Sequence, residues 1–486
     1  MLFNSYFFIL FFLPLTLFLY FILNYVKWER TAKLVLIAMS LWFYAYFRIG
    51  YLAIILISVF ANYGISKALM KMESLVCRRW ILTAGIMGNI GVIAYFKYMN
   101  FMLENMNYFL NTSFSLKKIL MPLGISFFTF QQISYLVDSY RRETGAYGLV
   151  DYVMFITFFP QLVAGPIVMH GEMIPQFQDP VRRRFSQDNL ARGLYLFSIG
   201  LAKKVLIADT MGQAVEWGFD NPQNLSAIGT FVLSLLYTFQ LYFDFSGYCD
   251  MAGGIAWMFG IELPVNFNSP YKAVSIADFW KRWHISLTKF LRKYVYFPLG
   301  GNRKGRLRTY LNTMVVYLVS GIWHGANWTF IMWGSVHGIA QIVNKICSRR
   351  WDKIPKVIRW FATFLFIDLS WLIFRADSLK DCGILFRNML SGKPGGIALE
   401  MSQCFDIIEF TYVEDHVGIL GSIAGSAPHI HMWIFLVISF LVTLAGRNCY
   451  EKKFRRTVAN AFGCIVLLVW SIMSLSGLSV FLYFNF

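Results

Sequence analysis

The sequence predicts an all-α, polytopic integral membrane protein, and three observations support that prediction. Of 486 residues, 57% are hydrophobic and only 14% are charged, whereas a soluble domain carries about a quarter charged residues. The first apolar run extends from Tyr6 to Tyr25 and is followed at once by Lys27, Glu29 and Arg30. Further apolar runs recur at about 20 residues, the length that crosses a bilayer.

The first run has neither the shorter apolar region nor the small-residue cleavage site of a secretory signal, so we expect it to be retained. Basic residues follow it and none precedes it. The positive-inside rule therefore places the N-terminus outside the cytoplasm. The spans that we expect lie near residues 5–25, 32–48, 50–68, 80–98, 119–137, 150–168, 193–210, 228–248, 308–325, 328–346, 356–375, 432–447 and 458–483.

Three stretches predict broken or re-entrant helices, because Pro, Gly or polar residues interrupt them: 121–137, 160–177 and 244–304. At membrane depth such backbone is tolerated only where it is buried in protein or lines a cavity. A functional site is therefore expected beside them. The longest stretch outside the bilayer is 377–431, interpreted as a lid, a docking surface or a plain connecting loop.

The net charge of +18 does not indicate nucleic-acid binding. The basic residues cluster between apolar segments, which is typical of cytoplasmic loops. The seven cysteines form no CxxC pair, so we predict neither a disulfide framework nor a zinc site.

His284 is one of two histidines whose surroundings indicate a function. Helical spacing would place Asp278 beside Arg282 and Trp280 beside His284, on one short helix. An ion pair, Trp rings and an imidazole on one helix indicate a polar cavity. The alternative is an interfacial helix with a Trp belt and snorkelling basic residues.

His324 is the second histidine whose surroundings indicate a function. It follows the apolar run 314–319 and lies close to Trp323, Gly325 and Asn327 in the sequence. An ionisable residue at that depth indicates a functional site, and imidazole can take a proton from a hydroxyl. The alternative is a neutral histidine hydrogen-bonded between helices. His337 is expected to support it or to be structural.

The remaining histidines predict no site. His429 and His431 form an HxH pair, but no third ligand stands in a recognised spacing, so no metal site is predicted. His170 and His416 carry no signal.

Two further groups of polar residues have weaker patterns. Asp244 and Asp250 are interpreted as supporting carboxylates that orient the histidines or pair with Lys281, Arg282 or Arg292; acid–base catalysis is the alternative. The glycine turn at 300–301 precedes basic residues that suit phosphates, or that form an ordinary cytoplasmic loop. These basic residues are Arg303, Lys304 and Arg306.

Several of these segments together resemble the membrane-bound O-acyltransferase (MBOAT) family, above all its bacterial polysaccharide branch, represented by the alginate O-acetyltransferase membrane subunit. The likeness covers residue 1 to about 376. Its motifs are Phe96-Lys97-Tyr98, 123–127, 135–138, 159–166, 202–209, 242–251, 279–287, 300–303, 318–333 and 371–376.

The resemblance implies a helical bundle around a central tunnel, with His324 as the principal catalytic histidine and His284 as the second. Trp323, Asn327, His337, Asp244 and Asp250 would support them. It also implies that acetyl-CoA is the acyl donor on the cytoplasmic side of a bacterial cell membrane, with no permanently bound cofactor. A separate extracytoplasmic esterase-like protein would then modify a polysaccharide acceptor, either an alginate-like polymer or a cell-wall polymer such as peptidoglycan.

The expected domain organisation is a membrane core at 1–376, an extramembrane segment at 377–431 and C-terminal membrane helices at 432–486. Two other functions remain open on the sequence. One is teichoic-acid D-alanylation by the same fold, and the other is transport of a polysaccharide or small molecule, although no internal repeat supports transport.

Overall fold

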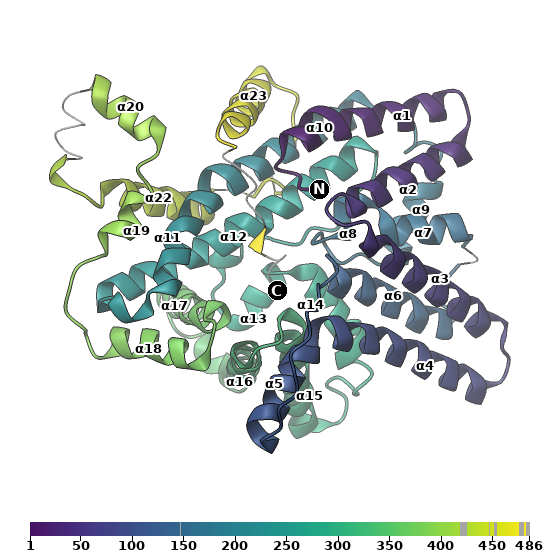
Figure 1. Cartoon of the computed structure of the whole chain (residues 1–486), viewed down its shortest axis with the longest axis horizontal. Coiled ribbons are helices and arrows are strands. Elements are labelled where there is room, and N and C mark those ends of the chain that lie inside the picture. The colour runs from purple at the N-terminus through teal and green to yellow at the C-terminus, as the bar shows by residue number, and fades with distance from the viewer. Residues whose placement is uncertain (146, 418–424, 447, 452–453, 476–480, 483–486) are drawn as a thin grey trace.

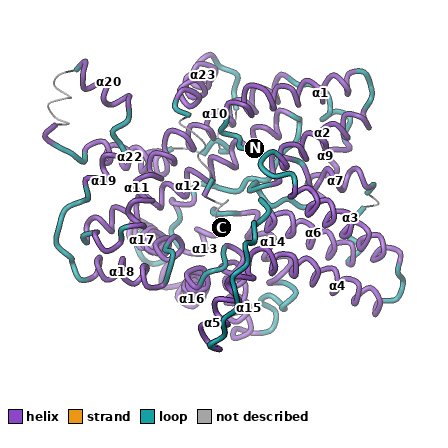
Figure 2. Tube along the Cα trace, in the orientation of Figure 1, coloured by secondary structure: helices purple, strands orange, loops and turns teal. Residues whose placement is uncertain are grey.

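The protein is described from a computed structural model that covers all residues except 146, 418–424, 447, 452–453, 476–480 and 483–486. Helices make up the fold, and the described residues contain no strand (Figure 2). Among the described residues, five helical stretches are long and apolar enough to cross a membrane: Phe8–Tyr25, Gly50–Lys71, Leu75–Leu110, Ala227–Met258 and Lys356–Arg375. The prediction of a multi-pass, all-α membrane protein is therefore confirmed.

Among the N-terminal helices, the first four α-helices lie on one side of the molecule (Figure 1). Each of these four packs against the next, and Met1, Leu2 and Phe3 before them are buried. The bounds of the N-terminal helices are η1 Phe8–Phe12, α1 Leu13–Tyr25, α2 Glu29–Ala45, α3 Gly50–Lys71, α4 Leu75–Ile93, η2 Ala94–Tyr98 and α5 Met99–Leu110. Helix α6 follows as Ile125–Tyr140 and packs against α3 and α4.

The two expectations of a broken helix before residue 180 have different outcomes. The helix expected at 121–137 is unbroken from Ile125, because the Pro and Gly lie in the turn before it. The stretch from 150 to 177 is broken, so the continuous span expected at 150–168 is wrong. It contains α7 Leu149–Thr157, α8 Phe159–Leu162, a non-helical link and α9 His170–Gln178.

Helix α12 is the central element, and its 32 residues Ala227–Met258 are buried almost throughout. It is longer than the span expected at 228–248, because a helix that is surrounded by protein need not match the bilayer thickness. Before it lie α10 Gln187–Ala202, η3 Lys203–Ala208, α11 Asp209–Asp220 and η4 Pro222–Asn224.

Helices α10 and α12 approach closely where glycines face each other. A Cβ atom on Gly200 would lie 2.6 Å from the carbonyl oxygen of Gly247, and one on Gly193 would lie 2.6 Å from that of Gly254. Small residues at such crossings allow backbones to approach in membrane helices. This contact brings η3, which continues α10, beside the middle of α12.

Short elements follow α12 in the polar stretch that we expected to be broken: η5 Pro270–Lys272, α13 Ile276–Arg282, α14 Ile285–Leu291 and η6 Arg292–Tyr296. Three long helices come next, and their bounds agree with the expected spans to within a few residues. They are α15 Gly305–His324, α16 Trp328–Trp351 and α17 Lys356–Arg375.

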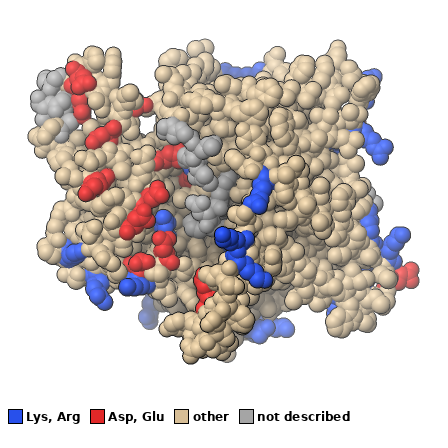
Figure 3. Space-filling model, viewed as in Figure 1, with Lys and Arg blue, Asp and Glu red and all other residues tan. Residues whose placement is uncertain are grey.

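The segment after residue 376 is helical and is not a plain connecting loop. It contains α18 Leu379–Leu390, α19 Leu399–Gln403 and α20 Ile408–His416, followed by α22 Ile430–Phe440, η7 Leu441–Ala445 and α23 Val458–Met473. The last expected span, 458–483, runs partly outside the described residues. Acidic side chains gather over α11 and α20, at the end of the molecule away from α3 and α4 (Figure 3).

Candidate active site

The two histidines singled out from the sequence face each other in the interior. The ring centroids of His284 and His324 lie 6.4 Å apart, and their planes are inclined by 58°. The exposed fractions are 0% for His284 and 3% for His324. His324 is the last residue of α15, and His284 directly precedes α14.

The prediction that one helix carries both Trp280 and His284 is wrong. Asp278 and Arg282 do pair, with 2.9 Å between Oδ1 and Nε, but α13 ends at Arg282. His284 then adopts φ 45°, in the left-handed region, which costs a residue other than glycine about 1–3 kcal/mol. Trp280 contacts His337 instead, because its Nε1–H donates to Nδ1 of His337 at 3.2 Å.

Aromatic rings surround the histidine pair. Trp323, Trp333 and Phe374 have centroids 4.9, 5.3 and 5.2 Å from that of His324, and Phe245 lies 4.9 Å from His284. Helices α12, α14, α15, α16 and α17 thus converge here. Rings that exclude water lower the local dielectric, so polar groups at this point interact more strongly than in water.

Lys97 on η2 holds the end of α15 from the other side. Its Nζ donates to the carbonyl oxygens of Trp323 at 2.7 Å and His324 at 2.8 Å. A cation at the C-terminus of a helix satisfies carbonyls that have no partner within the helix. No role was predicted for Lys97, although a lone Lys in an apolar span indicates a functional position.

The expected supporting residues lie around this centre. His337 Nε2 is 3.1 Å from Ser370 Oγ on α17. Trp323 Nε1 lies 3.5 Å from the carbonyl oxygen of Ser126 on α6. Asn327 accepts from the Thr329 backbone N–H at 3.2 Å and donates to the Asp377 carbonyl at 2.7 Å, so it fixes the turn between α15 and α16.

Asp244 and Asp250 pair with cations that we had not considered. Lys204 Nζ lies 2.6 Å from Asp244 Oδ1, and Lys203 Nζ lies 2.6 Å from Asp250 Oδ2. Lys281, Arg282 and Arg292, which we considered as partners, are not the cations in these pairs. The two ion pairs join η3 to α12, next to the point where Gly200 of α10 faces Gly247 of α12.

A large cavity adjoins one of these ion pairs. It has a volume of about 1740 Å³ and lies between α10–α12 and the C-terminal helices α20, α22 and α23. Lys203, Lys204, Asp244 and Arg375 line it. The tunnel around the histidines that the family resemblance implies stays a prediction.

The basic residues considered for phosphate binding lie at the opposite end of α15. Arg303, Lys304 and Arg306 are exposed in and after a glycine turn, in which Gly300 and Gly301 have φ 101° and 57°. His324 is 18 residues beyond Arg306, or roughly 27 Å at the rise of an α-helix. The three basic residues and His324 therefore lie at opposite ends of α15.

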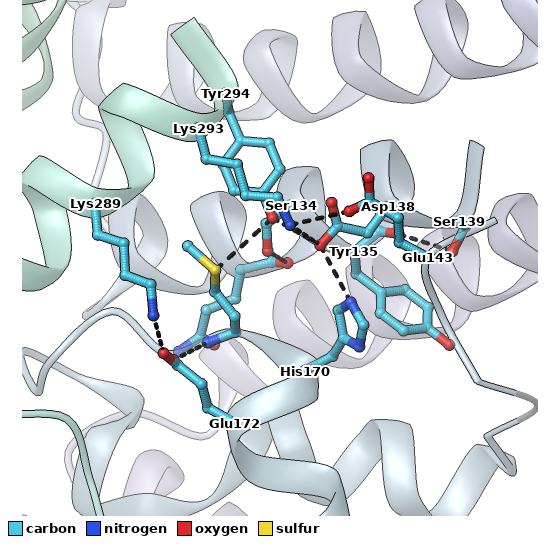
Figure 4. A network of polar contacts seen from close by, with 12 residues as sticks. Ser134, Tyr135, Asp138, Ser139, Glu143, His170, Glu172, Lys289, Lys293 and Tyr294 are labelled. Atoms are coloured by element: carbon cyan, nitrogen blue, oxygen red, sulfur yellow. Dashed lines mark hydrogen bonds and ion pairs between the residues drawn. The ribbon is translucent and has the colours of Figure 1, made fainter. Parts of the chain in front are cut away.

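A second buried polar cluster was not found from the sequence (Figure 4). Asp138, 1% exposed, accepts from Tyr294 OH at 2.7 Å and Lys293 Nζ at 3.0 Å, and its Oδ2 lies 3.1 Å from His170 Nε2. Nearby, Lys289 pairs with Glu172. The cluster joins α6 and α9 to the helical stretch that begins after His284.

His429 and His431 have separate partners. His429 contacts Ser402, whereas His431 lies 2.7 Å from Asp406 and 2.6 Å from Glu414. Within the described part of the chain, no group of three or more His, Cys, Asp or Glu side chains is arranged to hold a metal ion.

Comparisons with known proteins identify several relatives of this chain. The chain is 40% identical to a peptidoglycan O-acetyltransferase of Helicobacter pylori, over 100% of this chain and 98% of the relative. It is 38% identical to a probable alginate O-acetylase AlgI of Pseudomonas aeruginosa, over 80% and 75% of the two chains. A teichoic acid D-alanyltransferase of Streptococcus thermophilus is 27% identical over 52% of this chain and 68% of that protein.

Residues 9–375 match the family described as MBOAT, membrane-bound O-acyltransferase. This range contains both histidines and the helices that bring them together. The chain is a membrane-bound O-acyltransferase and belongs to the MBOAT family.

Proposed function

We propose that this protein takes acetyl groups from cytoplasmic acetyl-CoA and passes them across a bacterial cytoplasmic membrane for O-acetylation of peptidoglycan. The observation that carries the proposal is the buried pair His284 and His324, with ring centroids 6.4 Å apart. Two imidazoles in a dry aromatic enclosure suit proton transfer during acyl transfer.

In this reaction His324 accepts the proton of the acceptor hydroxyl. The hydroxyl oxygen forms a bond to the acetyl carbonyl carbon, and the carbon–sulfur bond of the thioester breaks. The departing thiolate takes up a proton, so the products are an acetyl ester and free coenzyme A. His284 orients the reacting groups beside His324.

Peptidoglycan is the acceptor that we favour because of the extent of the match. The relative named for peptidoglycan aligns with 100% of this chain, including residues 377–486. The alginate relative aligns with 80%, and the D-alanyltransferase with 52%. The family membership favours an enzyme over the transporter considered above.

The proposal includes a donor site and a partner. Arg303, Lys304 and Arg306 would attract the phosphates of the coenzyme at the cytoplasmic end of α15. A separate extracytoplasmic esterase-like protein would complete the transfer to the polymer. The helices between residues 379 and 416 are the segments that would meet it.

The test compares cells that carry wild type, His324→Ala or no copy of the gene, with protein levels checked in the membrane. The ester-linked acetyl content of peptidoglycan and of secreted polysaccharide is measured in each. We expect peptidoglycan acetyl esters to be lost in both altered strains. Lys353→Ala is the control, because Lys353 is exposed in the turn after α16 and lies outside the histidine pair, the donor site and the partner segments.

Loss of acetyl esters from a secreted polysaccharide alone would replace peptidoglycan as the acceptor. Normal ester content in every polymer of the His324→Ala strain, with the protein at its usual level, would remove the catalytic assignment. Loss of D-alanyl esters instead would move the function to teichoic-acid modification.

A further inference from the structure

Asn266 is the residue that connects His284 to the surrounding polypeptide. It lies in the non-helical stretch between α12 and α13 and is 2% exposed. Its Oδ1 is 3.2 Å from His284 Nδ1, 3.1 Å from Ser286 N and 2.8 Å from Ser286 Oγ. One amide oxygen thus contacts both the ring of His284 and the backbone N–H and hydroxyl of Ser286.

The backbone N–H of Ser286 decides which way the amide of Asn266 faces. A backbone N–H can only donate, so the atom 3.1 Å from it must be the amide oxygen and not the NH₂ group. The Nδ2 atom then faces Cys249 Sγ at 3.4 Å, to which it donates. The opposite orientation would set two donors against each other.

The orientation of the amide also decides the protonation of His284. An amide oxygen accepts hydrogen bonds only, so Nδ1 of His284 must carry the proton. A neutral imidazole has one N–H, and its second nitrogen carries the lone pair. The lone pair of neutral His284 is therefore at Nε2.

The same amide is tied to the broken segment before α9. Ser286 Oγ donates to Asn266 and accepts from the Ile167 backbone N–H at 3.0 Å. In addition, the Ile285 N–H donates to the Asn266 carbonyl at 3.0 Å. These bonds offset the left-handed backbone of His284, which has φ 45°.

We propose that Asn266 is a positioning residue that holds the His284 ring and fixes its Nδ1–H tautomer, so that Nε2 accepts a proton or a hydrogen bond during acyl transfer. The inference rests on the proposed function for its catalytic meaning, although the tautomer can be measured without it. Asn266 acts through His284, as carboxylates and amides do beside other functional histidines.

The titratable groups that face this ring come from several helices. His324 on α15 lies 6.4 Å away between centroids, and Lys97 on η2 contacts the carbonyl of His324. Cys249 on α12 contacts the other end of the Asn266 amide. A carboxylate at position 266 would therefore be a new charge in direct contact with His284.

The direct test is solid-state NMR of the full protein labelled with [¹⁵N]histidine in lipid bilayers. The His284 signals are assigned by their absence in His284→Gln. We expect the Nδ1–H tautomer in the wild type and a mixed or Nε2–H population in Asn266→Ala. An Nε2–H tautomer in the wild type would overturn the proposal.

The kinetic test uses membranes of the cells that naturally make this protein, so that the proposed esterase-like partner is present. Acetyl-CoA and soluble peptidoglycan fragments are added, and free thiol is measured. Asn266→Ala should lower kcat about 10- to 100-fold with little change in KM, as loss of an orienting partner does elsewhere. Asn266→Asp keeps the acceptor oxygen and adds charge, so the acid limb of its pH–rate profile should move to higher pH. Asn268→Ala, two residues away, is the matched control.

An unchanged kcat in folded Asn266→Ala, or a profile of Asn266→Asp that overlays the wild type, would overturn the proposal. The Asp variant is nearly isosteric, so it remains informative if the Ala variant does not fold. A wild type that releases no thiol from acetyl-CoA would instead contradict the proposed function, while the NMR result would still decide the tautomer.

Discussion

The ammonium group of Lys97 lies 2.8 Å from the carbonyl oxygen of His324 and 2.7 Å from that of Trp323. It caps α15 at the residue on which the site depends. The lysine comes from the N-terminal helices and the histidine from the C-terminal half of the core. This contact therefore ties the two sides of the bundle together at the histidine pair.

Replacing Lys97 with Met should impair both activity and stability. Met keeps the length of the side chain but removes the charge and the donors, so two carbonyls at the end of α15 lose their partner. We expect at least about a tenfold loss of acetyl transfer, with a contribution of up to ~2 kcal/mol from the helix terminus. Thermal unfolding in detergent and thiol release from acetyl-CoA measure the two effects. Lys353→Met, at an exposed position, is the control, and a fully active Lys97→Met protein would contradict the prediction.

Changing Arg303, Lys304 and Arg306 together to Gln should raise the KM for acetyl-CoA without lowering kcat. Each exposed charge contributes about 0.5 kcal/mol to binding. Because 1.4 kcal/mol corresponds to a factor of ten, the loss of all three charges should raise the KM about tenfold. An effect confined to KM indicates binding that is equal in the ground and transition states. Steady-state kinetics against acetyl-CoA make the measurement.

The matched control for this triple variant is Arg349, Arg350 and Lys353 changed to Gln, which removes the same charge from exposed positions at the end of α16. Equal KM values for the two triple variants would show that the glycine turn has no specific role in donor binding. A fall in kcat for the first variant alone would assign these residues to the chemical step.

The elements that sequence predicted well are those in which one local pattern decides the structure. The bounds expected for α15, α16 and α17 were within a few residues, because a long apolar run with basic ends has few alternatives in a bilayer. His324 was singled out as a candidate for the same reason. A lone imidazole after an apolar run is visible without knowledge of its neighbours.

The elements that were missed depend on contacts between distant segments. The periodicity of Trp280 and His284 fits a helix, but the Asn266 contacts hold His284 in a left-handed turn. His170 had no local signal because its partner, Asp138, is on α6. The partners of Asp244 and Asp250 follow from the crossing of α10 and α12, which no single segment reveals.

The Asp138 cluster predicts an order of stabilities. Asp138→Asn removes a charge that contacts both Lys293 and His170. Tyr294→Phe leaves that charge in place and removes the hydrogen bond to it, worth about 1 kcal/mol, together with a long contact to Met169 Sδ. Breaking a buried ionic contact costs more, about 3–5 kcal/mol when it is fully desolvated. Asp138→Asn should therefore unfold at a clearly lower temperature than Tyr294→Phe. Equal melting temperatures would show that the carboxylate charge contributes little.

The pair Lys203 and Asp250 allows a structural role to be separated from a catalytic one. Lys203→Met leaves a carboxylate that is only 3% exposed beside an apolar side chain, so we expect a large loss of folded protein. Adding Asp250→Leu removes the uncompensated charge and should restore both the melting temperature and acetyl transfer. Arg359→Met, which breaks the exposed contact with Asp352, should change stability by less than about 1 kcal/mol.

The decisive variant is the double replacement of Lys203 and Asp250. If it folds normally and transfers acetyl groups at the wild-type rate, Asp250 supports the fold by pairing with η3 and takes no part in the reaction. If it folds normally but is inactive, Asp250 has a chemical role despite its place in an ion pair. Because Lys203, the partner of Asp250, lines the cavity beside the C-terminal helices, the second result would direct attention from the histidine enclosure to that cavity.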